Sequence, residues 1–122
     1  MVCAAAGGTG VGVLQAAADA GILSIGVDSN QNHLHSGQVL TSMLKRVDNA
    51  TYDTFKNGVE GFEAGVVTMD LSSDGVGYAL DEHNAELVSE EMVAAVEAAK
   101  AKIIAGEISV HNYTDSDSCP VM

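Results

Sequence analysis

The chain has 122 residues, of which 47% are hydrophobic but only 4% are aromatic, so it can bury the core of one domain with mainly aliphatic side chains. Its 17 Asp and Glu residues outnumber 5 Lys and Arg residues, giving a formal net charge of −12. This balance argues against nucleic acid as a partner and against attraction to anionic lipid, because the chain has no basic patch to neutralise phosphates.

The opening residues predict a strand and a helix joined by a glycine-rich turn. Residues 2–6 form an apolar run typical of a buried strand, and residues 10–20 repeat apolar side chains at helical spacing. The side chains expected on the buried face of this helix are Val11, Leu14 and Ala18. Gly21 is expected to end the helix, because glycine readily adopts the left-handed conformation that often follows a last helical turn.

The turn Gly7-Gly8-Thr9-Gly10-Val11-Gly12 is a candidate ligand-binding corner. Glycine lets a ligand approach the backbone closely, and the N–H groups at a helix start favour polar or anionic ligand groups. The spacing matches neither the dinucleotide-binding G-x-G-x-x-G motif nor a P-loop, which requires Gly-Lys-Ser/Thr. The alternative is a tight turn whose small residues serve only the packing of helix against sheet.

The second apolar run, Ile22 to Val27, is typical of a strand covered on both faces, as in a parallel sheet. Residues 2–27 should therefore form two adjacent parallel strands with a helix between them. Asp28 follows at the carboxyl end of the second strand, where α/β proteins place ligand-binding groups. A carboxylate there can accept hydrogen bonds from two vicinal ribose hydroxyls. The alternative role for Asp28 is that of a strand-end turn residue or a helix cap.

A polar loop over residues 28–38 leads to a third predicted strand over residues 39–47. Lys45 lies on an otherwise apolar face of that strand. Because an unpaired buried ammonium is costly, Lys45 should meet a carboxylate or a ligand, or its head should reach water at the strand end. His33 and His35 in the loop could bind a metal, but no third ligand has matching spacing, so solvated loop histidines are favoured.

A helix is predicted from a cap at Asp48 or Asn49 to about residue 60, with Gly61 just beyond its end. Its apolar side chains are expected to belong to the core rather than to a stacking platform, and they are Tyr52, Phe55 and Val59. The segment that follows contains, in order, a candidate strand, a turn and a short strand, at residues 65–71, 72–75 and 76–80.

The last helix is predicted over residues 89–105, with Ser89 as N-cap and Gly106 as terminator. Its apolar stripe is expected to be buried and consists of Met92, Val96, Ala99 and Ile103. Since strands and helices mostly alternate along the chain, the predicted class is α/β.

The remaining residues give little sign of catalysis or of metal binding. Cys3 is expected to act as a small hydrophobe in its buried strand, and Cys119 is expected to be exposed in a polar tail. The acidic sequence Asp115-Ser116-Asp117 lacks the glycine and the distal glutamate of a calcium loop. With no nucleophile elbow and no Cys/His pair, we expect no catalytic residues, no metal and no cofactor. We also predict no membrane span and no signal peptide in this chain, so as it stands it would be cytosolic.

Several segments, in a fixed order, carry a family resemblance. They are Ala4-Ala5-Ala6-Gly7-Gly8-Thr9-Gly10-Val11-Gly12-Val13, Ile25-Gly26-Val27-Asp28-Ser29-Asn30-Gln31, Val39-Leu40-Thr41-Ser42-Met43-Leu44-Lys45-Arg46-Val47, Gly75-Val76-Gly77-Tyr78-Ala79-Leu80 and the final helix. Over roughly residues 2–110 the chain resembles the basic membrane protein family, the purine nucleoside receptor A-like lipoproteins that serve ABC transporters.

The resemblance implies a type I periplasmic-binding-protein fold, in which α/β lobes with parallel sheets and flanking helices clamp a ligand. It implies a substrate-binding role, and not an enzyme, in the import of purine nucleosides through an ABC permease, at the extracytoplasmic side of a membrane. Gly8, Thr9 and Gly10 would line the cleft, Asp28 would hold the ribose hydroxyls, and Lys45 would contribute a polar contact to the ligand.

The resemblance also implies a domain organisation. Family members are longer and begin with a signal peptide and a lipid-modified cysteine. Residues 1–110 would therefore be the C-terminal portion of a substrate-binding domain, followed by a mobile acidic tail over residues 111–122. Such a portion is expected to self-associate through apolar surface. The alternatives are a freestanding α/β enzyme or regulatory domain with a nucleotide at the Gly7–Gly12 turn, and a non-functional fragment with exposed sheet edges.

Overall fold

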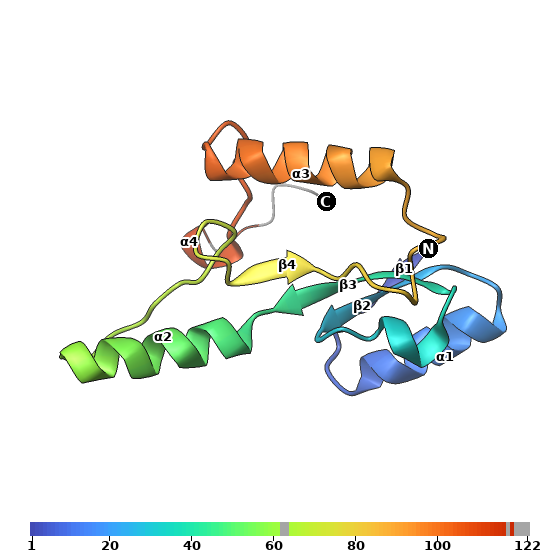
Figure 1. Ribbon diagram of the computed structural model, residues 1–122, viewed down its shortest axis with the longest axis horizontal. Coiled ribbons are helices and arrows are strands. Elements are labelled where there is room, and N and C mark those ends of the chain that lie inside the picture. Colours follow the sequence, from blue (N-terminus) through green and yellow to red (C-terminus); the bar gives the residue numbers. More distant parts are fainter. Residues whose placement is uncertain (62–63, 117, 119–122) are drawn as a thin grey trace.

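The strands and helices alternate along most of the chain, as the sequence predicts. The computed structural model describes residues 1–61, 64–116 and 118. In chain order the elements are β1 (Val2–Cys3), α1 (Thr9–Asp19), β2 (Ser24–Asp28), the 3₁₀ helix η1 (Asn32–His35), β3 (Val39–Lys45), α2 (Val47–Glu60), β4 (Val76–Tyr78), α3 (Glu90–Ile104) and α4 (Tyr113–Ser116). Figure 1 shows α1 and α3 on opposite sides of the sheet.

The sheet has four strands in the order β1-β2-β3-β4. β1, β2 and β3 are parallel, with Val2 opposite Ser24 and Asp28 opposite Leu44, which confirms the predicted strand–helix–strand unit. β4 is antiparallel to β3, with Met43 opposite Tyr78. The sheet is thus mixed rather than wholly parallel, because the chain leaves it after β3, forms α2 and returns alongside the same strand in the opposite direction.

Helix α1 packs on the sheet through a different face from the predicted one. Its buried residues are Gly10, Leu14 and Ala17, whereas Val11 is 44% exposed. A Cβ on Gly10 would lie 3.3 Å from the Ala4 carbonyl oxygen, so α1 approaches the β1 segment through its smallest residue and turns Val11 outward.

Gly21 ends α1 as predicted. It has φ of 64°, its N–H donates to the Ala18 carbonyl, and the Ile22 N–H donates to the Ala17 carbonyl. This pair of bonds satisfies carbonyl groups of the last helical turn. Cys3 in β1 is exposed, which corrects its expected burial. The reason is that β1 is a two-residue strand at the edge of the sheet, with β2 as its neighbour.

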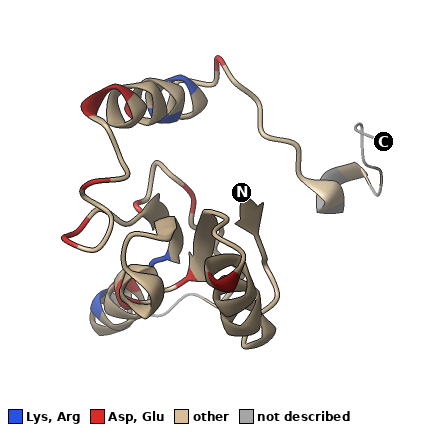
Figure 2. Ribbon diagram, turned by 90° about the vertical axis from the view of Figure 1, so that its right-hand side faces the viewer, with Lys and Arg blue, Asp and Glu red and all other residues tan. Residues whose placement is uncertain are grey.

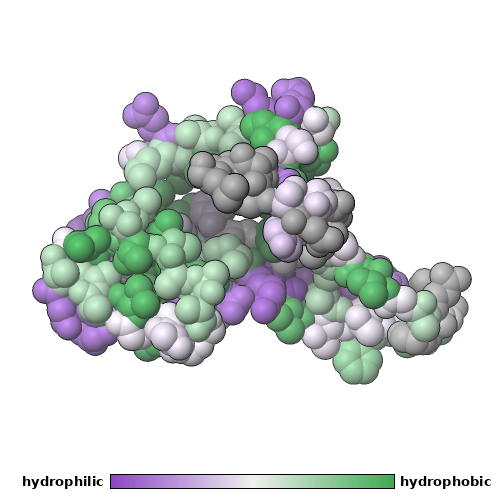
Figure 3. Space-filling model, turned by 180° about the vertical axis from the view of Figure 1, so that it is seen from behind, coloured by the Kyte–Doolittle hydropathy of each residue, from purple (hydrophilic) through white to green (hydrophobic). Residues whose placement is uncertain are grey.

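Helix α2 projects away from the sheet (Figure 1). It begins at Val47 after Arg46, with no side-chain cap, so the predicted cap at Asp48 or Asn49 is wrong, although Gly61 does lie just past its end with φ of 131°. The apolar side chains predicted to join the core are instead exposed, Tyr52 by 67%, Phe55 by 74% and Val59 by 89%. Figure 3 shows hydrophobic surface on this projecting helix.

The predicted strand at residues 65–71 does not form. Val66 is 99% exposed and Val67 is 84% exposed. This segment runs from the far end of α2 back to the sheet, and no described strand lies beside it to complete its hydrogen bonds. The turn at residues 72–75 and the short strand β4 do form where the sequence predicts them.

Helix α3 has the predicted ends but lacks the predicted burial. The Ser89 hydroxyl accepts a hydrogen bond from the Met92 N–H at 3.2 Å, and Gly106 follows the helix with φ of 75°. None of the helix is buried, and Met92 and Val96 are 43% and 45% exposed. α3 covers β3 and β4 loosely: a hydrogen bond of 2.8 Å joins Tyr78 to Glu97 beside an apolar hollow of about 80 Å³.

Figure 2 shows acidic residues on helices and loops alike. Among the helices of the described residues, none is long and apolar enough to span a bilayer. The short helix α4 lies in the segment predicted to be a mobile tail, and Cys119 lies outside the described residues.

The exposed face of α2 predicts self-association of the 122-residue chain. Burying Phe55 and its neighbours against a second copy removes apolar surface from water, while the net charge of −12 opposes contact. We therefore expect sedimentation equilibrium to show a mass above that of the monomer, increasing as salt screens the repulsion. Phe55→Ser should lower this association, whereas Asn57→Ser, on the opposite side of α2, should not. A monomer at every salt concentration would contradict this expectation.

Candidate functional site

Three connections meet at one edge of the sheet because β1, β2 and β3 are parallel. The glycine-rich turn follows β1, Asp28 ends β2, and Lys45 ends β3. In Figure 1 the arrowheads of β2 and β3 point to this edge, from which α2 also departs. The carboxyl ends of parallel strands are where open α/β sheets bind ligands.

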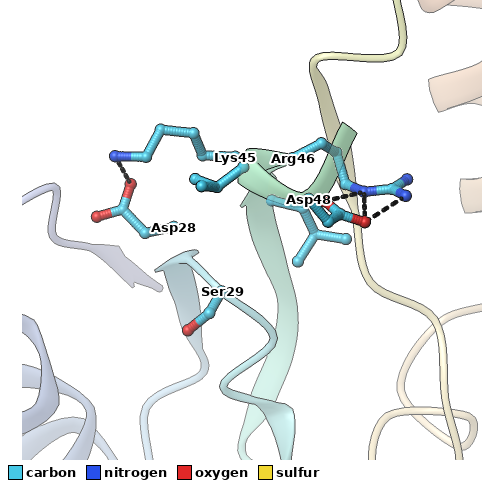
Figure 4. A pocket seen from close by; sticks show the side chains of 7 residues that line it. Asp28, Ser29, Lys45, Arg46 and Asp48 are labelled. Atoms are coloured by element: carbon cyan, nitrogen blue, oxygen red, sulfur yellow. Dashed lines mark hydrogen bonds and ion pairs between the residues drawn. The ribbon is translucent and has the colours of Figure 1, made fainter. Parts of the chain in front are cut away.

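An open groove of about 430 Å³ lies at this edge between the ends of β2 and β3. Its lining contains two carboxylates, two cationic side chains, a hydroxyl and two aliphatic residues (Figure 4). These residues are Asp28, Ser29, Leu44, Lys45, Arg46, Val47 and Asp48.

Asp28 and Lys45 form an ion pair across the groove. Lys45 Nζ lies 3.3 Å from Asp28 Oδ1, and the two side chains are 60% and 48% exposed. Of the three possibilities raised for Lys45, two are therefore met, since its side chain contacts a carboxylate and is also exposed to water. Asp28 has φ of 73°, a left-handed conformation that Asp tolerates better than most residues.

Arg46 points away from Lys45 and binds the start of α2, as Figure 4 shows. Its Nη2 lies 2.9 Å from Asp48 Oδ2 and its Nε lies 3.0 Å from Asp48 Oδ1. Its Nη1 also lies 3.4 Å from Asp74 Oδ2, and its backbone N–H donates to the Gly75 carbonyl at 2.9 Å. Arg46 thus joins the exit of the chain from the sheet to its return, directly beside the groove.

The Arg46–Asp48 contact predicts an acid-dependent loss of stability. The hydrogen bond from Arg46 holds the pKa of Asp48 below its usual value. A lowered folded-state pKa stabilises the protein above the unfolded pKa of about 3.9, and this contribution disappears as the pH falls through the folded value. The urea midpoint of the unmodified chain should therefore exceed that of Asp48→Asn near neutral pH, and the difference should close in acid. A difference that stays constant down to about pH 2 would contradict the assignment.

Gly8, Thr9 and Gly10 lie at the same edge of the sheet but do not line this groove. The N–H groups of Thr9, Gly10 and Val11 donate to the carbonyls of Ala6, Gly7 and Gly8, at 3.2, 3.0 and 3.4 Å. Since these N–H groups already have acceptors, they are poorly suited to cradle a phosphate. Gly10 is buried where α1 packs against the sheet. This agrees with the alternative given for the turn, in which its small residues serve helix packing.

A buried polar cluster between β3 and the loop after β2 was not predicted from the sequence. Asn32 and Ser42 are each 0% exposed, and the Ser42 hydroxyl donates to Asn32 Oδ1 at 2.7 Å. Asn32 Nδ2 donates to Asp81 Oδ2 at 3.1 Å, which connects the loop after β2 with the loop after β4. The polar composition of residues 28–38 indicated only a solvated loop, because its one buried member cannot be recognised without its distant partners.

Histidine rings from two loops lie near each other. The rings of His33 and His83 lie 6.3 Å apart between centroids, and His83 Nδ1 lies 2.8 Å from the Ser36 hydroxyl. Within the described ranges 1–61, 64–116 and 118, no group of three or more His, Cys, Asp or Glu side chains is placed to hold a metal ion.

Comparison with known proteins gives a family match over most of the chain. Residues 1–114 match the Bmp family model, described as ABC transporter substrate-binding protein PnrA-like. Basic membrane protein D of Borreliella burgdorferi is 39% identical over 88 residues, which are 68% of this chain and 26% of that protein. An uncharacterised lipoprotein of Pyrococcus abyssi is 39% identical over 57 residues, covering 46% of this chain and 14% of its own length.

Solved structures share the fold. An ABC transporter solute-binding protein from Aeropyrum pernix superposes with a TM-score of 0.75 at 29% identity, covering 95% of this chain and 41% of that one. A transcriptional activator of the comK gene from Bacillus halodurans gives a TM-score of 0.74 over 98% of this chain and 38% of its own. At 24% identity, the second likeness shows the fold alone. The chain therefore spans less than half the length of each of these relatives.

Proposed function

We propose that this chain, which belongs to the Bmp family of PnrA-like ABC transporter substrate-binding proteins, contributes the ribose-binding groove of a purine nucleoside receptor. The observation that carries the proposal is the Asp28–Lys45 pair across the open groove at the carboxyl ends of β2 and β3. The carboxylate of Asp28 can accept hydrogen bonds from a pair of sugar hydroxyls. The ammonium of Lys45 beside it can donate a hydrogen bond to a ring or carbonyl oxygen of the same ligand.

Asp28 is suited to hold two vicinal hydroxyls. Its Oδ1 lies 3.3 Å from Lys45 Nζ, and its side chain is 48% exposed, so a ligand can reach the carboxylate from solvent. An ionised carboxylate accepts hydrogen bonds at both oxygens, and bonds to a charged acceptor are stronger than neutral ones. Lys45, with three donor hydrogens, can contact the ligand while it remains near Asp28.

The charge balance of the groove favours a neutral ligand over a phosphorylated one. Lys45 and Arg46 are matched by Asp28 and Asp48, and Arg46 is already engaged by Asp48. The N–H groups after Gly8 donate within their own turn. A nucleoside therefore fits this edge of the sheet better than a nucleotide does.

We propose that Gly8, Thr9 and Gly10 contact the part of the ligand that extends beyond the groove.

The role in transport is proposed from relatives that are longer than this chain. Two of its relatives are named as a basic membrane protein and a lipoprotein, and the Aeropyrum relative is an ABC transporter solute-binding protein. We propose that the ligand passes to an ABC permease at the extracytoplasmic face of a membrane. We propose a binding role rather than a catalytic one, in keeping with the substrate-binding description of the family that the chain matches.

The open groove predicts weak binding by the 122-residue chain alone. A tightly held ligand has most of its surface buried, whereas the side chains of Asp28 and Lys45 are 48% and 60% exposed. Net hydrogen bonds of about 1 kcal/mol each cannot offset the rigid-body freedom that the ligand loses. We therefore expect inosine and adenosine to bind no tighter than roughly millimolar, or about −4 kcal/mol.

Isothermal titration with inosine, adenosine and AMP tests this proposal. The two nucleosides should give weak saturable heats, and AMP should bind more weakly still because of its phosphate. Micromolar affinity for either nucleoside would contradict the argument from exposure. Preference for AMP would contradict the argument from charge and favour a nucleotide-binding domain.

A further inference from the structure

The carboxylate of Asp81 is the meeting point of two loops. Asp81 lies after β4, and its Oδ2 accepts hydrogen bonds from Asn30 Nδ2 at 2.6 Å and from Asn32 Nδ2 at 3.1 Å. Its Oδ1 accepts the backbone N–H of His83 at 2.8 Å, and its own N–H donates to Asn84 Oδ1 at 2.9 Å. The Asp81 carboxylate therefore holds the side-chain amides of Asn30 and Asn32, in the loop that begins directly after Asp28.

The same loop is held from its other side by β3. The Gln31 N–H donates to the Ser42 hydroxyl at 3.0 Å, and Ser42 in turn donates to Asn32 Oδ1 at 2.7 Å. Gln31 Oε1 accepts the Val27 N–H at 2.9 Å, at the end of β2. Residues 30–32 are thereby clamped between β3 and Asp81, and the chain between Val27 and Asn30 has to reverse sharply.

Asp28 is the residue at which this reversal occurs. Its φ of 73° lies in the left-handed region, which Asp tolerates better than most residues but which still costs free energy for a residue with a Cβ, so contacts around Asp28 decide how far this conformation is favoured. This conformation sets the direction in which the Asp28 side chain leaves the backbone, and hence its 3.3 Å approach to Lys45.

We propose that Asp81 is a positioning residue for the groove: by holding Asn30 and Asn32, its carboxylate keeps Asp28 in the left-handed conformation that presents its side chain to Lys45 and to the ligand. The consequence for ligand binding rests on the function proposed above, whereas the consequence for the conformation of Asp28 does not. Asp81 does not line the groove and acts through Asn30 and Asn32.

Nuclear magnetic resonance of the 122-residue chain tests the conformational part directly. A positive φ at Asp28 gives a strong intraresidue N–H to Hα cross-peak, and amides that donate to a carboxylate give side-chain resonances shifted downfield. Asp81→Ala should weaken the cross-peak and move the Asn30 and Asn32 side-chain resonances upfield. Asp81→Asn, which keeps one acceptor oxygen but loses the charge, should produce a smaller change of the same kind.

Asp70→Ala is the matched control, since Asp70 also accepts local hydrogen bonds in a turn, from Ser72 and Ser73, but contacts neither Asn30 nor Asn32. It should leave the Asp28 signature unchanged. If Asp81→Ala fails to fold, Asp81→Asn decides the matter. An unaltered Asp28 cross-peak and unaltered amide resonances in a folded Asp81 variant would overturn the proposal.

A millimolar inosine titration followed in the same spectra separates this proposal from the proposed function. If both hold, Asp81→Ala should weaken the inosine-dependent shifts about three- to tenfold in apparent affinity, in the same direction as Asp28→Ala. If Asp81→Ala changes the Asp28 signature but neither variant alters the response to inosine, the positioning role stands and the nucleoside function fails. If Asp28→Ala weakens binding while Asp81→Ala leaves both signature and binding intact, the positioning role fails.

Discussion

Asp28→Ala is expected to weaken ribonucleoside binding by about 1–3 kcal/mol, which is roughly a fivefold to 150-fold rise in Kd. The loss arises because the sugar hydroxyls would enter the groove without their acceptor, and because Lys45 would lose its carboxylate partner at 3.3 Å. The effect is best measured by calorimetry in a hybrid in which this chain replaces the part of the Aeropyrum pernix solute-binding protein that it matches, 41% of that protein.

The substitution should also change which sugars are distinguished. A ribonucleoside presents both hydroxyls to the carboxylate, whereas a 2′-deoxynucleoside presents only one. Asp28→Ala should therefore cost the ribonucleoside more affinity than the 2′-deoxynucleoside. Asp70→Ala, in a turn outside the groove, serves as control and should leave both affinities unchanged. Equal nucleoside affinities for the unmodified hybrid and the Asp28 variant would remove Asp28 from the site.

Gly26→Ala is expected to destabilise the fold by about 1–3 kcal/mol, the usual cost of forcing extra atoms into a packed interior. The new Cβ would lie 2.5 Å from Ser42 Oγ and 2.9 Å from Gln31 Cβ. Ser42 cannot turn away without cost, because its hydroxyl accepts the Gln31 N–H and donates to the buried Asn32. Displacing it would leave buried polar groups without partners.

Gly12→Ala provides the contrasting control for this prediction. Gly12 lies within α1, where a Cβ would meet nothing within 4 Å. Alanine should there stabilise the chain by about 0.5–1 kcal/mol, because it restricts the unfolded chain and favours the helix. Urea denaturation of both variants checks the pair. Equal urea midpoints for Gly26→Ala and the unmodified chain would show that the clamp on residues 30–32 is looser than these contacts indicate.

The ends of α1 and α3 marked by Ser89, Gly21 and Gly106 followed from local chemistry and could be predicted, whereas the predicted cap of α2 was wrong. Ser89 caps α3, and Gly21 and Gly106 end their helices, because these residues act on backbone groups within one turn. The parallel pairing of β1 with β2 followed from a continuous apolar run. Asp28 and Lys45 could be singled out because each departs from its neighbours, one as a carboxylate ending an apolar strand and the other as a cation within one.

Burial was harder to predict because it depends on what lies opposite a face. The stripe containing Phe55 and that containing Met92 have sound helical spacing, yet Phe55 is 74% exposed and Met92 is 43% exposed. The spacing shows which side chains share a face of the helix, but it does not show whether another element covers that face. The burial of Asn32 could not be predicted for the same reason. Its side chain bonds to Ser42, ten positions along the chain, and to Asp81, 49 positions along.

The most direct test of the groove as a ribose site is a residue-resolved NMR titration of the 122-residue chain with millimolar inosine and, separately, 2′-deoxyinosine. We expect the largest shifts at Asp28, Ser29 and Lys45, smaller ones at the turn Gly8-Thr9-Gly10, and consistently larger shifts with inosine than with its deoxy analogue. Shifts of equal size for the two ligands, or shifts confined to residues away from the ends of β2 and β3, would contradict the account.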